Sequence, residues 1–364
     1  MTEEKNTLLF TSEFPPLPGG IGNHAHHLST YLQNSGCDVE VVTDFRSQEL
    51  DRTFDQNHVC KVHRIKRNAL TPINRLIKAF TVVKRNQAVI CSGKFPLWMG
   101  GLLQVFFRNK KYTAILHGSE IRAGGTFSKA LTQWSLNRFE KIIAVSNFTK
   151  ERALKFQPNL QIDVINNGFE MFKSNSLDEK IHIQGQPKII TIGNVTYRKG
   201  QHNVIKALPF LKKTFPEIHY HCIGIPTERN AFQKLALQLD VEKNITFHGA
   251  LPETDLVAIL KESDVFLMLS DVLENGDFEG FGIAILEANA LGKPAIGSNN
   301  SGIKDAIKSG FSGELVDPKS NKEISDALMK ILNNYDFYTA NAIQWSTEFT
   351  WEKVGRKYRE ILER

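Results

Sequence analysis

The chain has 364 residues, of which 41% are hydrophobic and 23% are charged, a composition that excludes an intrinsically disordered protein. At about 150 residues per domain this length indicates two domains. The formal net charge of +6 allows an anionic partner but does not establish one.

Four cysteines, Cys37, Cys60, Cys91 and Cys222, lie far apart in the sequence. Their spacing excludes a CxxC zinc or redox motif and provides no disulfide framework, which favours a reducing cytoplasm. The N-terminal residues MTEEKNTLLF lack the basic start of a signal peptide. Since no stretch of about 18 apolar residues is free of charge, we expect an intracellular protein without a transmembrane helix.

In the first half of the chain, short apolar runs alternate with helical periodicity, as in βαβ units of a parallel sheet. The pattern predicts helices that include Asn23–Gln33 and Lys129–Phe139. The predicted strands are Thr7–Ser12, Val39–Thr43, Ala88–Ser92, Tyr112–Leu116, Lys141–Val145 and Ile162–Ile165.

One segment of this first half is strongly basic. Between Gln56 and Ser119 there is no acidic residue, and Ile73, Leu76, Ile77 and Phe80 recur at helical spacing. A basic face beside exposed apolar residues is typical of a protein on an anionic membrane, where each basic residue contributes about 1 kcal/mol. The alternative is a solvated face over ordinary core helices, and no motif supports nucleic-acid binding. The basic residues of this segment, 61–111, are Lys61, Arg64, Lys66, Arg67, Arg75, Lys78, Lys84, Arg85, Lys94, Arg108, Lys110 and Lys111.

Two sites that could bind a ligand follow predicted strands of the first half. Gly19, Gly20 and Gly22 leave backbone N–H groups accessible at a helix N-terminus, where an anion is favoured, although a plain turn is the alternative. His117 follows a strand, and a histidine at that end of a parallel strand can donate to a sugar hydroxyl or a phosphate. The alternative for His117 is a structural role.

The segment 171–187 is polar and weakly periodic, which indicates a linker between domains 1–170 and 188–347. The βαβ pattern resumes after it. The predicted strands are Lys188–Asn194, Ile218–Gly224, Ile245–Phe247, Val265–Ser270, Pro294–Gly297 and Glu314–Val316, and the predicted helices are Gln201–Thr214, Arg229–Leu239, Leu256–Ser263, Gly282–Leu291 and Asn321–Asn334. We therefore expect an α/β protein with two Rossmann-like, doubly wound parallel-sheet domains facing a cleft.

The turn Gly193–Gly200 opens the second half and carries two adjacent cations. Arg198 offers a planar fork and Lys199 a point charge, which together suit a diphosphate. A charged turn without a ligand is the alternative. Because GxxxxGK[ST] is absent, a P-loop nucleotidase is excluded.

The most informative segment is Asp277–Ala290. Glu287 is the one charge on a nearly all-apolar helix from Ile283 to Leu291, and an unpaired buried carboxylate would cost several kcal/mol. We expect this carboxylate to bind ligand hydroxyls. An anion at Gly282 would lie about 7.5 Å along the helix axis from Glu287, a phosphate-to-ribose reach, and Glu279 would approach from the other side.

The segment E-G-F-G-I-x-x-L-E-A-x-A, with Glu279 and Glu287 separated by seven residues, resembles the signature of the retaining glycosyltransferases of family 4, which have the GT-B fold. The resemblance covers nearly the whole chain. Within the family, the chain is most similar to bacterial transferases of mannosylated lipids and envelope polysaccharides. Other matching motifs are the glycine loop Pro16–Gly22, His117–Glu120, Val145–Thr149, Asn167–Gly168 and the closing helix from Trp351, which is expected as 348–364 to pack back on the first domain.

The resemblance implies a role for each matching residue. Glu287 would bind the ribose diol, and Glu279 would bind hydroxyls of the donor sugar. The first domain would bind the acceptor and the second the nucleotide sugar. The remaining implied site residues are Gly280, Phe281, Gly282, Ile283 and Lys199 around the diphosphate, His117 at the donor sugar, Gly19 and Gly20 over phosphate or acceptor, and His248 and Leu251 near the nucleobase. The family usually has an arginine where this chain has Asn194, and Arg198 is the candidate replacement.

The implied reaction moves a hexose from a GDP- or UDP-linked donor to a lipid-linked or glycan acceptor with retention of configuration. The leaving phosphate takes the acceptor's proton, and no metal or other cofactor is expected because Lys199 and Arg198 balance the phosphate charge. A sugar-nucleotide 2-epimerase of the same fold and a non-catalytic scaffold subunit are the alternatives. The expected location is the cytoplasm, at the inner face of the plasma membrane.

Overall fold

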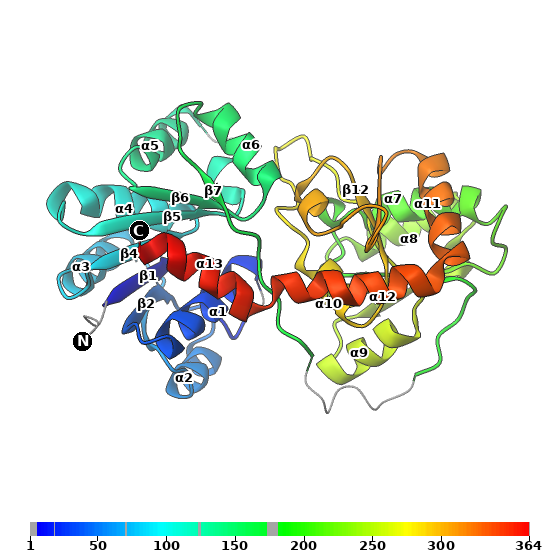
Figure 1. The fold of residues 1–364 in the computed structure, drawn as a ribbon, viewed down its shortest axis with the longest axis horizontal. Helices are drawn as coiled ribbons and strands as arrows, with labels where there is room; N and C mark the ends of the chain where they lie inside the picture. The colour runs from blue at the N-terminus through cyan, green and yellow to red at the C-terminus, as the bar shows by residue number, and fades with distance from the viewer. Residues whose placement is uncertain (1–5, 18, 70, 123–124, 173–180, 364) are drawn as a thin grey trace. The chain divides into compact units, whose positions relative to one another are not determined.

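The computed structural model describes residues 6–17, 19–69, 71–122, 125–172 and 181–363, and the chain divides into two compact units (Figure 1). Unit 1 is formed by Met1–Gly168 with Trp351–Arg364, and unit 2 by Phe169–Thr350. Each unit is an open parallel sheet with helices on both faces. The expected doubly wound α/β fold is therefore confirmed.

Unit 1 contains a seven-stranded sheet in the order β3-β2-β1-β4-β5-β6-β7, in which every neighbouring pair is parallel. Its strands are β1 (Thr7–Thr11), β2 (Val39–Asp44), β3 (Lys61–Ile65), β4 (Ala88–Ser92), β5 (Lys111–Leu116), β6 (Lys141–Ala144) and β7 (Asp163–Val164). Its helices are α1 (Gly20–Asn34), α2 (Gln48–Gln56), α3 (Thr71–Val83), α4 (Lys94–Phe106), α5 (Thr126–Leu136), α6 (Asn147–Phe156) and α13 (Trp351–Glu363).

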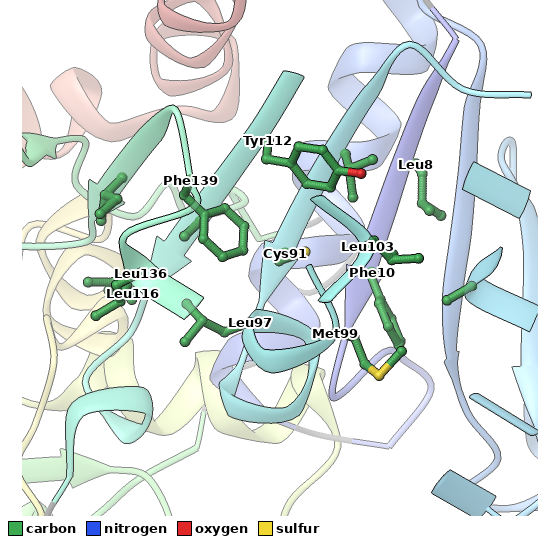
Figure 2. Close-up of a cluster of buried hydrophobic side chains, with 14 of the residues drawn as sticks. Leu8, Phe10, Cys91, Leu97, Met99, Leu103, Tyr112, Leu116, Leu136 and Phe139 are labelled. Atoms are coloured by element: carbon green, nitrogen blue, oxygen red, sulfur yellow. The ribbon is translucent and has the colours of Figure 1, made fainter. Parts of the chain in front are cut away.

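Alternate residues of the unit 1 strands enter opposite cores. Leu8 and Phe10 of β1 pack with α3 and α4 on one face, in the cluster drawn in Figure 2. Leu9 of the same strand packs with α1 and α13 on the other face. Because both faces are buried, the central strands are nearly continuous apolar runs, which made them predictable.

Unit 2 repeats this architecture with six parallel strands in the order β10-β9-β8-β11-β12-β13. Its strands are β8 (Lys188–Ile192), β9 (His219–Ile223), β10 (Ile245–Gly249), β11 (Val265–Met268), β12 (Ala295–Ser298) and β13 (Gly313–Val316). Its helices are α7 (Gln201–Leu211), α8 (Arg229–Gln238), α9 (Glu253–Glu262), α10 (Ile283–Ala290), α11 (Asn321–Asn333) and α12 (Tyr335–Ser346).

All predicted strands are present, and no strand end differs from its prediction by more than two residues. The sequence analysis missed β3, whose sequence is KVHRI. This edge strand lacks an apolar pattern because its polar side chains form ion pairs with residues that are distant in the sequence. His63 Nε2 lies 2.5 Å from an oxygen of Glu40 on β2, and Arg64 pairs with acidic residues of α2.

The expected linker 171–187 and the C-terminal helix α13 pack against different units. Of the expected linker 171–187, residues 173–180 lie outside the described residues. Phe172, Ile181 and Ile183 pack against the core of unit 2, so these parts of the segment belong to that unit. The helix α13 packs against α1, where the buried Tyr358 hydroxyl lies 3.0 Å from His24 Nε2. Within the described residues, no helix is long and apolar enough to cross a membrane.

Candidate active site

In unit 2, the loop after β8 is held tightly against its neighbours. A Cβ on Gly224 would lie 2.2 Å from the Gly193 oxygen, so these two backbones meet in a way that only glycine permits. Gln201 Nε2 donates to the carbonyl of Asn194 at 3.1 Å, and Gln201 Oε1 accepts from the Thr196 amide at 3.2 Å. The loop that carries Arg198 and Lys199 is therefore fixed at the carboxyl ends of β8 and β9.

Arg198 and Lys199 meet at one carboxylate. Lys199 Nζ lies 2.9 Å from Glu279 Oε2, Arg198 Nη1 pairs with the same oxygen, and Arg198 Nε lies 3.9 Å from Asp277 Oδ2. Burial raises the pKa of Glu279, but the charges of Lys199 and Arg198 outweigh it and hold this pKa at about 2. Three of the predicted site residues, Arg198, Lys199 and Glu279, thus form one charged cluster.

The helix α10 begins beside this cluster without a side-chain cap. Gly282, its first flanking residue, has φ 94°, and the helix contains no acidic residue in its first turn. The Gly302 amide donates to the Glu279 carbonyl at 3.0 Å, and a Cβ on Gly302 would lie 2.0 Å from the Gly280 oxygen. These contacts hold the 279–281 turn in place, and the uncapped N–H groups after it can bind an anion.

Glu287, on α10, is half-buried, and its pKa is shifted in the opposite direction to that of Glu279. Burial raises its pKa to about 7, although Lys199 lowers it, and Glu253 raises it further. Among the described residues, Glu287 has no hydrogen-bond or ion-pair partner. A half-buried carboxylate without a partner is a candidate for binding ligand hydroxyls.

Three further predicted residues of unit 2 lie in different surroundings. Asn194 is exposed, and it adds no charge to the cluster around Glu279. His248 lies on β10, where its Nε2 is 3.0 Å from Nδ1 of His221, and burial lowers the pKa of His248 to about 4. Leu251 is half-buried and packs on the core of unit 2.

In unit 1, His117 lies at the carboxyl end of β5. Its Nε2 is 2.9 Å from Ser92 Oγ at the end of β4, and its ring packs edge-on against His24 with centroids 5.0 Å apart. Burial lowers the pKa of His117 to about 4, so the ring is neutral at pH 7. The buried Glu120 accepts hydrogen bonds from the amides of His117 and Gly118, both at 2.9 Å, and so fixes this turn.

The predicted glycine loop is supported by residues that the sequence analysis did not identify. A Cβ on Gly19 would lie 2.1 Å from an oxygen of Glu13, and Arg46 Nη1 donates to the Leu17 carbonyl at 3.2 Å. Gly20 begins α1 and is exposed, whereas Pro18 lies outside the described residues. The buried Asp51 accepts from the Arg46 amide at 2.7 Å and pairs with Arg64. The single cue in the sequence was acidic residues on a short polar helix, which is not specific.

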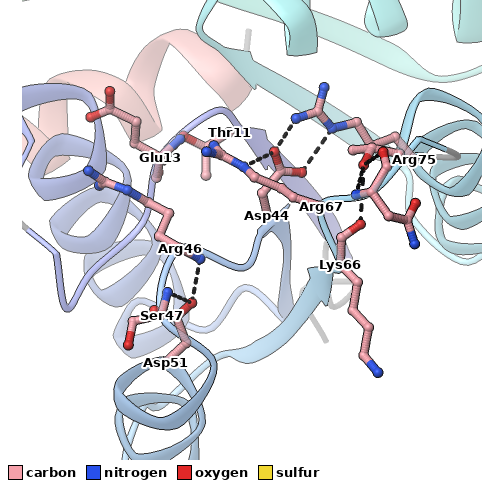
Figure 3. A network of polar contacts seen from close by, with 11 residues as sticks. Thr11, Glu13, Asp44, Arg46, Ser47, Asp51, Lys66, Arg67 and Arg75 are labelled. Carbon is pink, nitrogen blue, oxygen red and sulfur yellow. Dashed lines mark hydrogen bonds and ion pairs between the residues drawn. The ribbon is translucent and has the colours of Figure 1, made fainter.

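The structure corrects the expectation of a uniform basic face. Arg64 is almost fully buried between Asp51 and Asp55, and Arg67 and Arg75 pair with Asp44 (Figure 3). These acidic residues precede the basic segment, and parallel pairing of β2 and β3 brings the two together. Of the four apolar residues expected on one helix face, Ile73 and Ile77 are exposed, whereas Leu76 and Phe80 pack inward on the core.

Comparisons with known proteins are consistent with this architecture. Residues 18–171 match the model of Glycosyltransferase Family 4, and residues 173–344 match that of Glycosyl transferases group 1. The chain is 25% identical to a glycogen synthase of Mycobacterium tuberculosis, covering 97% of this chain and 93% of the relative. It is also 25% identical to a GDP-mannose-dependent alpha-(1-6)-phosphatidylinositol monomannoside mannosyltransferase of that organism, covering 98% of this chain and 97% of the relative.

Among solved structures, the Anabaena protein HepE in complex with UDP and glucose has the same fold. Its TM-score is 0.77 at 17% sequence identity, and the match covers 98% of this chain and 99% of the HepE chain.

Proposed function

Since the chain is a glycosyltransferase of the GT-B type, we propose that it is a retaining hexosyltransferase of family 4 acting in cell-envelope glycan synthesis. It moves a hexose from a nucleoside diphosphate sugar to a lipid-linked or polysaccharide acceptor. The observation that carries this proposal is the cluster in unit 2, where two cations, an uncapped helix N-terminus and an unpartnered carboxylate lie on adjoining segments.

Each part of this cluster has a role toward a nucleoside diphosphate sugar. The diphosphate binds Lys199 and Arg198 and the amides that follow Gly282 at the start of α10. Glu287 accepts hydrogen bonds from the ribose diol, and Glu279 accepts from hydroxyls of the sugar. Gly280 and Phe281 supply the turn between these two carboxylates.

The chemistry follows from the charge that develops in the reaction. When the bond between the sugar and the diphosphate breaks, negative charge grows on the β-phosphate and positive charge on the sugar ring. Cations fixed by Glu279 stabilise the leaving group without reorganisation, and so can the N-terminus of α10. The acceptor oxygen attacks from the same face, its proton passes to the leaving phosphate, and the proposal requires no metal and no protein nucleophile.

His117 acts in this proposal as a neutral hydrogen-bonding group. Its low pKa, caused by burial, prevents it from becoming a cation near the sugar, whose transition state is itself positive. Its Nδ1, the ring nitrogen that does not bond Ser92, can then hydrogen-bond a sugar hydroxyl or the acceptor without an opposing charge.

The nucleobase of the donor can be identified by nucleotide binding. One relative is named as GDP-mannose-dependent and one structural neighbour holds UDP, so both guanosine and uridine diphosphates are candidates. We propose a thermal-shift comparison of GDP, UDP and their hexose conjugates with the wild type, Lys199→Gln and the control Lys213→Gln, an exposed lysine of the same unit. A ligand that binds only the folded state stabilises it by RT ln(1 + [L]/Kd), so at equal concentration the tighter ligand gives the larger shift.

The expected result is stabilisation of the wild type and of Lys213→Gln by one of the diphosphates, with at least a tenfold loss of affinity in Lys199→Gln. Equal affinity in all three proteins would contradict the placement of the diphosphate. Turnover of the bound sugar nucleotide to an epimer without any acceptor would identify an epimerase instead, and no binding of any nucleotide would indicate a scaffold.

A further inference from the structure

A second charged cluster lies in unit 1, away from His117, at the carboxyl ends of β2 and β3. Asp44 ends β2, Lys66 and Arg67 follow β3, and Arg75 approaches from α3 (Figure 3). Ligands of doubly wound sheets bind outside the carboxyl ends of the strands. This cluster therefore lies on the edge of the sheet where a substrate of unit 1 is expected.

Two arginines in this cluster share one buried carboxylate. Arg75 Nε donates to Asp44 Oδ1 at 2.8 Å and Arg75 Nη2 pairs with Oδ2, while Arg67 Nε donates to Oδ2 at 3.2 Å. Asp44 is almost fully buried, whereas the Arg67 side chain is 58% exposed. One negative charge thus positions two positive ones, and the remaining charge faces solvent.

Asp44 does not need Arg67 as a second ion-pair partner for the stability of the fold. The two-point pairing with Arg75 already satisfies the buried carboxylate. An exposed second ion pair adds little to stability. Among the described residues, Asp44 is the one hydrogen-bond and ion-pair partner of Arg67, through Nε, so both terminal nitrogens of Arg67 remain able to donate to a ligand.

An independent feature at the same place also favours an anion. The Arg75 guanidinium lies 4.1 Å from the centre of the Phe95 ring, in the first turn of α4. This helix follows Gly93, has no side-chain cap and no acidic residue in its first turn, and begins with Lys94. The partial positive charge of an uncapped helix start therefore adds to that of the arginines.

We propose that Arg67, Arg75 and the start of α4 form a phosphate-binding subsite, and that the acceptor of this enzyme carries a phosphate or diphosphate group. This inference rests on the proposed function, because it names the chemical class of the acceptor. Three strand spacings separate β2 from β5, which is about 14 Å along the edge from this cluster to His117. That span is longer than a single hexose phosphate and leaves room for a diphosphate or a second sugar between the two positions.

The subsite can be tested by calorimetric titration of inorganic pyrophosphate into the full chain already saturated with the nucleoside diphosphate that stabilises it. Saturation occupies the Lys199 site, so further pyrophosphate reports on a second site. The variants are Arg67→Gln, whose exposed position makes a folding defect unexpected, and Arg67→Gln with Arg75→Gln. The control is Lys84→Gln with Arg85→Gln, two exposed cations of the same segment.

We expect one additional pyrophosphate to bind the wild type and the control equally, with at least a tenfold weaker affinity in Arg67→Gln. Equal binding in Arg67→Gln and the wild type, or no second binding event, would overturn the subsite. Since nucleotide saturation is measured first, a chain that binds no nucleotide fails the proposed function, whereas one that binds nucleotide but no pyrophosphate fails only this inference.

A second measurement separates the two sources of the phosphate group. The wild type is mixed with phosphatidylcholine vesicles that contain a polyprenyl phosphate, and flotation is measured with and without pyrophosphate. Flotation that pyrophosphate and Arg67→Gln both abolish supports a lipid-linked acceptor. Pyrophosphate binding without flotation supports a water-soluble sugar phosphate.

Discussion

Glu279 and Glu287 lie eight positions apart in the sequence, yet their surroundings shift their pKa values in opposite directions. Glu279 is ionised because Lys199 and Arg198 hold its pKa at about 2. Glu287 has a pKa of about 7 because it is removed from water without a comparable partner. A pair of carboxylates with separated pKa values indicates two different tasks in one site. Glu279 holds the two cations, and Glu287 is the carboxylate that binds the ribose in the proposed function.

The raised pKa of Glu287 predicts how stability depends on pH. Between 4.5 and about 7 the folded chain keeps a proton that the unfolded chain has lost, so stability falls as pH rises through this window. Since one pKa unit corresponds to about 1.36 kcal/mol, the ionised Glu287 lowers the free energy of unfolding by about 3 kcal/mol above pH 7. We therefore expect Glu287→Gln to stabilise unit 2 by up to about 3 kcal/mol at pH 8 and to have little effect at pH 4, as measured by denaturant unfolding.

The same variant should lose nucleotide affinity, because a carboxylate accepts hydrogen bonds from a diol more strongly than an amide does. The wild-type affinity should also rise between pH 6 and pH 8 as Glu287 ionises, and Glu287→Gln should lack this component. The exposed Glu274, in the loop before α10, provides the control Glu274→Gln, which should leave both profiles unchanged. A pH-independent effect of Glu287→Gln on stability would contradict the raised pKa.

At the level of elements, the position of the 279–281 turn depends on a close backbone contact. Gly302 packs so tightly on the 279–280 turn that a methyl group would lie 2.0 Å from the Gly280 oxygen. Gly302→Ala should move the turn and weaken the hydrogen bond from its amide to Glu279. We expect a loss of about 1–3 kcal/mol in stability, typical of overpacking, and about tenfold weaker nucleotide binding, measured by thermal unfolding and calorimetry.

Gly125→Ala provides a matched control, because among the described residues no heavy atom beyond its chain neighbours and its own helix backbone lies within 4 Å of the added methyl group. This glycine also has an ordinary φ of −58°. It should unfold as the wild type does and bind nucleotide equally. Normal nucleotide affinity in Gly302→Ala would show that the turn is not held by this contact.

Prediction from the sequence succeeded for strands that bury both faces of the sheet and failed for the edge strand β3. The strands β1, β4 and β8 are buried throughout or nearly so, and each contains consecutive apolar residues because both of its faces enter a core. By contrast, β3 is an edge strand in which three of the five residues are basic, and its place in the sheet depends on Glu40 and on the acidic residues of α2. Local periodicity carries no information about such distant partners.

At the scale of the whole molecule, the net charge of +6 does not by itself create a membrane-binding face. Several cations of the basic segment are paired with acidic residues, which leaves an exposed group made of Ile73, Ile77 and Phe106, with the exposed Arg108 two residues after Phe106. Ile73 and Ile77 lie on α3, whose inward-facing Phe80 contacts Phe106 with ring centroids 5.2 Å apart. We propose that this part of unit 1 attaches the protein to an anionic membrane.

The expected result is that Ile77→Glu with Phe106→Glu abolishes flotation of the protein with phosphatidylglycerol vesicles, because it inserts two charges into an apolar contact with lipid. Both side chains are more than half exposed, so the fold should persist. Leu237→Glu, an equally exposed position in unit 2, is the control and should float as the wild type does. Continued flotation of the double variant would reject this surface.

The sequence alone determined that each half of the chain alternates strands with helices. It also determined the loops after strands that carry His117, Lys199 and Glu279, and the position of Glu287 as the one charge on an apolar helix. These features are encoded by short-range periodicity and by glycine positions, so they can be read locally. The tertiary structure alone decided which charges neutralise one another. Arg64 meets Asp51, Asp44 holds Arg67 and Arg75, and Glu279 holds two cations, because the order of strands in a parallel sheet, and not distance along the chain, brings these groups together.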